Sequence, residues 1–200
     1  MPFEYVDLDI KQEVGWFRFN RPPINAVNLA MLGEMVAAFG TLDLNPKVKV
    51  IVIASALDRH FNAGADIEAF KQAGSKGMHG WLDQTYILAR KVRAASKPVL
   101  VAINGIAVGG GLEMSLHADL RFAADDAQLG QPEINIAIIP PVAGTQGLVR
   151  LVGRSNAFRI LYGGELFSAA EALEMGLIDF VLPVAPVSYT HLTLPTNREV

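Results

Sequence analysis

A run of three glycines followed by a glutamate is the most suggestive chemical feature of this sequence. Gly109, Gly110 and Gly111 come shortly after an apolar segment, and Glu113 lies in the short helix that we expect to begin there. The first amides of a helix have no partner within the helix and lie at the positive end of its dipole, so they favour an anion. Glycines also permit close packing of a helix on a strand. The run therefore indicates either an anion-binding turn suited to a developing enolate oxygen, or a packing motif.

A second loop of small residues could supply further amides. Residues 60–67 read His-Phe-Asn-Ala-Gly-Ala-Asp-Ile and follow another apolar segment. Ligand loops commonly follow the strands of open α/β sheets. Amides from two such loops could converge on one carbonyl oxygen, which is the arrangement that stabilises charge in a transition state. The alternative is that Ala-Gly-Ala forms only a turn.

Two carboxyl groups could share this site. Glu113 follows the glycines, and Glu133 stands in the segment Gln131-Pro132-Glu133, whose proline favours extended backbone before it. Two close carboxylates in an apolar pocket cannot both ionise easily, so one is driven towards its acid form and the pair can take and give a proton. The alternative for Glu113 is an exposed carboxylate at a helix start.

Other chemistries find less support in the sequence. His117 could share a helical face with Glu113, but no second histidine stands at ligand spacing and the sequence has no cysteine, so we predict no metal site. A phosphate-binding P-loop would need lysine where Gly111 stands, and neither G-x-G-x-x-G nor G-x-S-x-G occurs. Nucleotide binding and a serine triad are therefore disfavoured.

Composition sets the broader limits. The 200 residues are 51% hydrophobic and 18% charged with a net charge of -3, which is typical of a globular domain. Lysine and arginine form no basic run, so we expect no nucleic-acid partner. Without a long apolar stretch or a secretory signal at Met1, we expect no membrane association. With no cysteine, a reducing compartment fits, and we predict a cytoplasmic protein.

The elements that must position these residues alternate between strands and helices. We predict strands at residues 15–20, 48–53 and 99–103, the last two being apolar runs suited to burial on both faces. Helices are predicted by three patterns: a cap at Asn28 before Leu29, Leu32, Met35, Val36 and Phe39; an apolar face of Leu82, Tyr86, Ala89 and Val92; and a short helix over residues 112–118.

Two more helices are expected near the carboxy terminus. One begins at Ser155 and stops at Gly163-Gly164, and another opens with the capping box Ser168 to Glu171 and closes at Gly176. This alternation predicts an α/β domain with largely parallel strands. We assign residues 1–186 to one domain, and residues 187–200 to a non-native tail that resembles a cloning remnant, because their composition breaks from what precedes.

Four motifs in this order and spacing resemble the crotonase family, and specifically its enoyl-CoA hydratases. They are Pro23-Ile24-Asn25-Ala26-Val27-Asn28, Phe61-Asn62-Ala63-Gly64-Ala65-Asp66, Asn104-Gly105 through Gly109-Gly110-Gly111-Leu112-Glu113, and Gly130-Gln131-Pro132-Glu133. The resemblance continues through Gly144-Thr145-Gln146 and Leu151-Val152-Gly153 to Gly176-Leu177-Ile178, and covers nearly all of residues 5–183.

The resemblance implies a crotonase-like spiral of β-β-α units that binds an acyl-CoA thioester and assembles as a homotrimer or as a hexamer of two trimers. It implies no metal or redox cofactor, since coenzyme A belongs to the substrate. Family members continue into a carboxy-terminal helical region that covers the acyl pocket, and that region is expected to be missing here. Carried over by position, the amides of Ala65 and Gly110 form the oxyanion hole. Substrate-binding positions are Ala26, Ala63, Asp66, Ile67, Gly109 and Pro132.

In the hydratases that the chain resembles, a glutamate at Glu113 activates water for attack at C3, and one at Glu133 supplies the C2 proton. The sequence retains both. We therefore predict reversible hydration of a trans-2-enoyl-CoA in fatty-acid or related acyl-CoA degradation. Three alternatives stay open: an enoyl-CoA isomerase, a non-catalytic acyl-CoA-binding subunit, and the amino-terminal portion of a multifunctional β-oxidation protein.

One departure from the family pattern lies beside Glu133. The loop usually written Ile-Pro-Gly is Ile139-Pro140-Pro141 here. Pro141 fixes φ and removes an N–H that glycine would offer. We expect the shape of this loop to differ from the family pattern.

Overall fold

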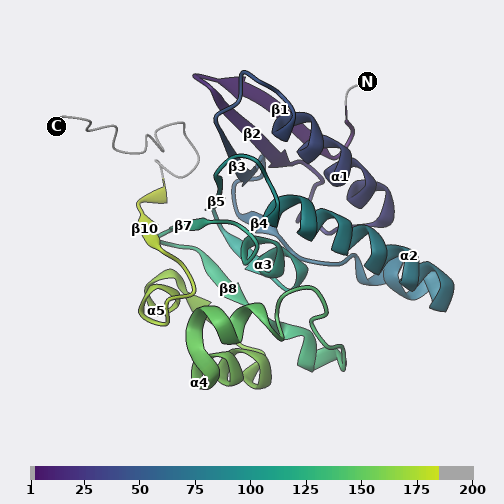
Figure 1. Cartoon of the computed structure of the whole chain (residues 1–200). Coiled ribbons are helices and arrows are strands. Elements are labelled where there is room, and N and C mark those ends of the chain that lie inside the picture. The colour runs from purple at the N-terminus through teal and green to yellow at the C-terminus, as the bar shows by residue number, and fades with distance from the viewer. Residues whose placement is uncertain (1–2, 185–200) are drawn as a thin grey trace.

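The larger of two β-sheets runs through the centre of the protein. The computed structural model describes residues 3–184 (Figure 1). Six strands lie in the order β1-β2-β3-β5-β7-β10; β1 is antiparallel to β2, and the other neighbours are parallel. Their bounds are Val6–Lys11 (β1), Val14–Phe19 (β2), Val50–Ser55 (β3), Val99–Ile103 (β5), Leu120–Ala124 (β7) and Phe180–Leu182 (β10). The predicted α/β class with largely parallel strands is confirmed.

The smaller sheet is built from the strands that follow those of the larger one. Its order is β4-β6-β8-β9, parallel except for the antiparallel pair β8 and β9. The strands are His60–Asn62 (β4), Ile106–Val108 (β6), Gln128–Gly130 (β8) and Leu166–Ser168 (β9). Along the chain β3 leads to β4 and α2, β5 to β6 and α3, and β7 to β8 and the 3-10 helix η1. This succession is the predicted spiral of β-β-α units.

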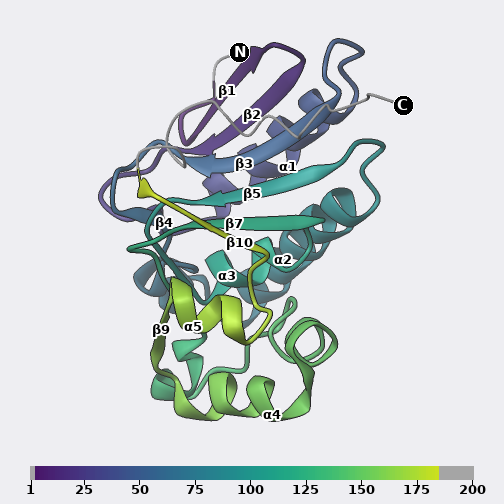
Figure 2. The same cartoon turned by 90° about the vertical axis from the view of Figure 1, so that its left-hand side faces the viewer.

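The helices occupy distinct places around the sheets. They are Leu29–Asp43 (α1), Ile67–Arg93 (α2), Gly110–Ser115 (α3), Pro132–Ile136 (η1), Gly147–Gly163 (α4) and Ala169–Glu174 (α5). α1 and α2 lie on the same side of the larger sheet, whereas α4 and α5 lie at the end of the molecule away from β1 (Figures 1 and 2). α3 directly follows β6 of the smaller sheet and carries Glu113.

Helix starts and stops that depend on local chemistry were predicted correctly. The Asn28 side chain caps α1 by accepting from the Met31 amide at 2.8 Å. Ser168 and Glu171 form the reciprocal capping box of α5. Gly164 ends α4 with φ 61°, a left-handed conformation that glycine adopts without strain. The predicted strand 99–103 is β5, and all of its residues are buried.

Two helices are longer than the patterns that predicted them. α2 begins at Ile67, before the predicted apolar face, and Tyr86 of that face is 41% exposed. The side of α2 that packs against the core carries Trp81, Leu88, Ala89 and Val92, and Tyr86 lies beside it. α4 spans Gly147–Gly163 but is broken at Gly153, where φ is 74°, so the helix predicted from Ser155 is the part that follows the break.

Within residues 3–184, no helix combines the length and apolar character needed to cross a membrane. The predicted non-native tail, residues 187–200, lies outside the described residues.

Candidate active site

The three glycines have three different surroundings. A Cβ on Gly111 would overlap the carbonyl of Asn62, so this glycine is required for packing α3 against β4. A Cβ on Gly109, whose φ is 55°, would lie 2.9 Å from Oε1 of Glu133. A Cβ on Gly110 would lie 3.6 Å from the Gly64 Cα and 3.9 Å from the Ala65 nitrogen. The packing interpretation therefore holds for Gly111, whereas Gly109 and Gly110 face the other predicted site residues.

Ala65 lies in a turn held by hydrogen bonds on both sides. The Val27 amide donates to the Gly64 carbonyl at 2.7 Å, and the Asp66 amide donates to the Val27 carbonyl at 2.9 Å. The Asn62 side chain accepts from the Gly64 amide at 2.9 Å. Because the peptides before and after Ala65 are fixed, the direction of its own amide is fixed as well. The structure thus brings Ala65 next to Gly110, the first residue of α3, whose amide has no partner within the helix.

Glu113 is a buried carboxyl group held by backbone amides. It is 2% exposed, which rules out the exposed helix-start alternative. Its Oε1 accepts from the amides of Val142 at 2.8 Å, Ala143 at 2.7 Å and Gly144 at 2.8 Å. Burial raises the pKa of Glu113 because desolvation disfavours the charged form, and the three amides oppose that rise by stabilising the carboxylate. Oε1 is thereby anchored, which leaves Oε2 as the oxygen available for chemistry.

Glu133 is in a contrasting environment at the start of η1. Its Oε2 is buried without a hydrogen-bond partner among the described residues. Desolvation raises the pKa of Glu133 to about 7, and the negative charge of Glu113 adds to the rise. A carboxyl group with this pKa is substantially protonated at neutral pH, so it can donate a proton as well as accept one.

One cleft of about 260 Å³ joins these groups. Most of the predicted site residues line it: Ala63, Ala65, Ile67, Gly109, Gly110, Glu113, Pro132 and Glu133. Apolar side chains from α2, from η1 and from the segment after η1 make up much of the remaining wall, including Phe70, Trp81, Ile136 and Ile138. The cleft therefore holds two carboxyl groups and two adjacent small-residue turns in an otherwise apolar surrounding.

Comparison with known proteins shows the family of the chain. Residues 9–197 match the family model described as enoyl-CoA hydratase/isomerase. The chain belongs to this family. The crotonyl-CoA hydratase of Syntrophomonas wolfei is 38% identical over 186 residues, which is 91% of this chain and 70% of that protein. A probable enoyl-CoA hydratase of Bacillus subtilis is 36% identical over 174 residues, covering 86% of this chain and 67% of the relative.

Solved structures of the enoyl-CoA hydratase/isomerase family share the fold. The enoyl-CoA hydratase from Bacillus anthracis superposes with a TM-score of 0.88 at 34% identity, over 92% of this chain and 72% of that one. A structure from Geobacillus kaustophilus gives 0.90 at 29% identity, over 94% and 72% of the two chains. The crotonase fold that the motifs implied is confirmed.

Ala26 and Asp66 are the predicted binding residues that do not line the cleft. Asp66 instead caps α2, accepting from the Ala69 amide at 3.2 Å, and pairs with Arg21 at 2.9 Å. Arg21 also donates to the Ala26 carbonyl at 2.5 Å. A hydrogen bond from the Ala69 amide, and then the Arg21 guanidinium, hold the pKa of Asp66 below its usual range. These two residues therefore lie behind the Ala65 turn and are joined through Arg21.

Sequence reasoning missed the groups that support the site. Neither Arg21 nor the amides of residues 142–144 were given a role by the sequence analysis. Asn25 entered only through its motif; it is fully buried, and its side chain donates to the Phe61 carbonyl at 2.9 Å and to Ser55 Oγ at 2.8 Å, which ties the two loops together. The burial of Asn25 and its φ of 54° are visible only in the structure, although asparagine is among the residues that adopt a positive φ most readily.

The predicted departure at Pro141 has little effect on the amides around Glu113. The donors to Glu113 begin at Val142, so the N–H that proline removes is not one of them. The Pro141 carbonyl accepts from the Tyr86 hydroxyl at 3.2 Å, which places Tyr86 against the loop instead of in the core. Gly144 is the constrained position, because a Cβ there would lie 2.5 Å from Pro140.

His117 does not form part of a metal site in the structure. Across residues 3–184 no group of three or more histidine, aspartate or glutamate side chains could hold a metal ion. Desolvation lowers the pKa of His117 to about 4, and Arg93 contributes to the same direction, so the imidazole is neutral at pH 7. It lines the space behind Gly110, together with Met114.

Proposed function

We propose that this protein catalyses the reversible addition of water to a trans-2-enoyl-CoA. The observation that carries the proposal is the pair of carboxyl groups in unequal environments, lining one cleft with the adjacent turns at Ala65 and Gly110. Relatives named as crotonyl-CoA and enoyl-CoA hydratases support it.

The proposed sequence of events starts at the thioester carbonyl. Its oxygen accepts hydrogen bonds from the Ala65 and Gly110 amides, which polarise the conjugated double bond and make C3 electrophilic. Glu113, as the carboxylate, takes a proton from water while the water oxygen bonds to C3. The electron pair of the double bond moves towards the carbonyl, forming an enolate whose oxygen the same amides stabilise.

Protonation at C2 completes the addition. Glu133, protonated because of its raised pKa, gives its proton to C2 as the enolate collapses to the thioester. Glu113 then carries the proton taken from water and Glu133 carries none. A proton must return from the first carboxyl group to the second before the next turnover, and both groups line the same cleft.

The test is direct. Incubation of the protein with crotonyl-CoA should remove the absorbance of the conjugated enoyl thioester until equilibrium is reached, and a Glu113→Gln/Glu133→Gln double variant should not. Persistence of the enoyl absorbance with the folded wild-type chain would contradict hydration. Retention of acyl-CoA binding in that case would favour the non-catalytic binding subunit.

An isomerase is the second candidate because the same two acids could carry a proton between C2 and C4. The family description covers both reactions. A 3-enoyl-CoA substrate separates them, since only isomerisation generates the conjugated absorbance. Retention of both carboxyl groups favours hydration, because adding water needs one group to activate the water and another to protonate C2.

The remaining parts of the proposal rest on sequence reasoning and the family resemblance. We propose that no metal or redox cofactor is needed, that the protein acts in the cytoplasm in acyl-CoA degradation, and that it assembles as a trimer or hexamer. Light scattering measures the assembly, and activity after dialysis against a chelator tests the independence from metal.

A further inference from the structure

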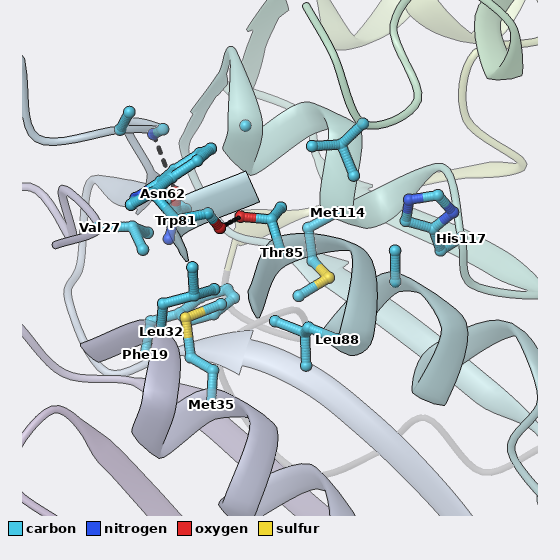
Figure 3. A pocket seen from close by; sticks show the side chains of 15 residues that line it. Phe19, Val27, Leu32, Met35, Asn62, Trp81, Thr85, Leu88, Met114 and His117 are labelled. Carbon is cyan, nitrogen blue, oxygen red and sulfur yellow. Dashed lines mark hydrogen bonds between the residues drawn. The ribbon is translucent and has the colours of Figure 1, made fainter. Parts of the chain in front are cut away.

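An apolar cavity lies directly behind the two turns that meet the proposed carbonyl site. Gly64, Ala65, Gly110 and Trp81 line both this cavity and the active-site cleft. The rest of its wall is largely hydrocarbon or thioether, from Phe19, Leu32, Met35, Leu88 and Met114 (Figure 3). Asn62, Thr85 and His117 are the polar side chains on this wall, and a wall that is mainly apolar fits an alkyl chain better than the polar pantetheine chain.

The cavity is small. Its volume is about 30 Å³. Since a cavity needs roughly 10–15 Å³ on this measure to hold one water-sized group, the space accommodates about two or three methylene-sized groups. The part of an acyl chain that could enter is therefore short.

Trp81 stands at the boundary between the cavity and the cleft. It projects from α2 and packs edge-on against Phe70 with ring centroids 5.6 Å apart. Its carbonyl accepts from the Thr85 hydroxyl at 2.8 Å (Figure 3). Met114 lies on α3, one residue beyond Glu113, and is 7% exposed. These two large side chains come from different helices, and shortening either one would enlarge the cavity.

We propose that this cavity receives the end of the acyl chain, and that Trp81 and Met114 limit the substrate to short, unbranched enoyl groups of about four to six carbons. The inference rests on the proposed function, whose carbonyl position it uses. It adds the chain length and names the side chains that set it.

The experiment compares trans-2-enoyl-CoA substrates of four, six, eight and ten carbons. For the wild-type protein, kcat/KM should fall by at least about tenfold between six and eight carbons, the order expected when an apolar pocket cannot hold an added methylene. Trp81→Ala and Met114→Ala should each reduce that fall and raise kcat/KM for the longer substrates. Trp81→Leu serves as a milder replacement, and thermal melts confirm that each variant folds.

Two control variants make the result specific. Leu82→Ala removes a comparable apolar group from the neighbouring position of α2, which lines neither the cavity nor the cleft, and should leave the chain-length profile unchanged. Phe70 lines the active-site cleft but not the cavity, so Phe70→Ala enlarges the cleft alone, which is called the outer cleft below. A change in profile with Phe70→Ala and none with Met114→Ala would place the acyl chain in the outer cleft and overturn the proposal.

A second measurement separates this inference from the proposed reaction. Calorimetric titration with butyryl-CoA and octanoyl-CoA reports binding without turnover. Weaker binding of octanoyl-CoA that Trp81→Ala reverses supports the cavity assignment even if no enoyl-CoA is hydrated, in which case only the proposed reaction fails. Equal binding of both compounds, or equal hydration at all four lengths, overturns the chain-length proposal while leaving hydration intact.

Discussion

Glu113 and Glu133 are chemically identical and line the same cleft, yet the chain surrounds them in opposite ways. Glu113 projects from a regular helix, and three consecutive amides of the loop at residues 142–144 donate to one of its oxygens. Glu133 lies at the start of a 3-10 helix with one oxygen buried and unpartnered among the described residues. Desolvation raises the pKa of both, but three amides partly offset the rise at Glu113.

This difference explains how one pair of identical side chains can divide the work of an acid and a base. Donors aimed at a carboxylate favour its charged form, and burial without donors favours the neutral form. The different environments support the proposed roles, in which Glu113 acts as the base and Glu133 as the acid. Substitution of either glutamate tests these roles.

The largest effect is expected from removing either carboxyl group. Glu113→Gln and Glu133→Gln should each lower kcat for crotonyl-CoA by at least about a hundredfold, the usual order for an acid–base group. The amide that replaces the Glu113 carboxylate can still accept from the three backbone donors through its carbonyl oxygen, so the fold should persist, and circular dichroism checks this. Retained activity in both variants would rule out the pair as the catalytic groups.

The pH dependence should report Glu133 separately. Its pKa is raised to about 7, and the proposed reaction needs its protonated form, so kcat/KM for hydration should decline as pH rises through about 7 and fall about tenfold per pH unit above it. The residual activity of Glu133→Gln should lack this decline. A wild-type profile that stays flat from about pH 6 to about pH 9 would contradict the assignment of Glu133 as the acid.

How far the site could be predicted depends on the range of the interactions that form it. Asn28, the Ser168 capping box and the glycines before α3 were predictable because the deciding contacts lie within a few residues. The amides around Glu113 were not, because they come from a loop about thirty residues later whose approach is set by packing. Tyr86 has a helical apolar spacing, but nothing in that spacing shows that it lies beside the buried face of α2, where its hydroxyl reaches Pro141.

The ion pair of Arg21 and Asp66 also joins residues that are far apart in the sequence, so it could not be predicted. Removing this pair should have a smaller effect on activity than removing a carboxyl group. It joins the segment of Ala26 to the residue after Ala65, so losing it should let the Ala65 amide deviate from its direction. Arg21→Gln should lower kcat about tenfold with little change in KM, because a misplaced donor costs transition-state stabilisation. Arg21→Lys should restore part of the loss. An unchanged kcat would show that the backbone bonds of Val27 alone hold the turn.

The smallest effect concerns stability and tests the contrast between the two carboxyl groups without any substrate. Because the folded-state pKa of Glu133 lies above its unfolded value, the protein loses stability as pH rises from about 4.5 to about 7, and the full penalty remains above that range. Glu133→Gln removes the penalty. It should therefore be more stable than wild type at pH 8, by about 1 kcal/mol once partial exposure is taken into account, and no more stable at pH 4.

Urea unfolding at the two pH values measures this difference, and Glu174→Gln, at an exposed position of α5, is the matched control expected to show none. Glu113→Ala should behave in the opposite way to Glu133→Gln. It leaves three amides near the buried site without their acceptor, so it should destabilise the protein at pH 8. If both variants shifted stability in the same direction, the two carboxyl groups would not differ as their hydrogen bonding indicates, and the division into base and acid would lose its structural basis.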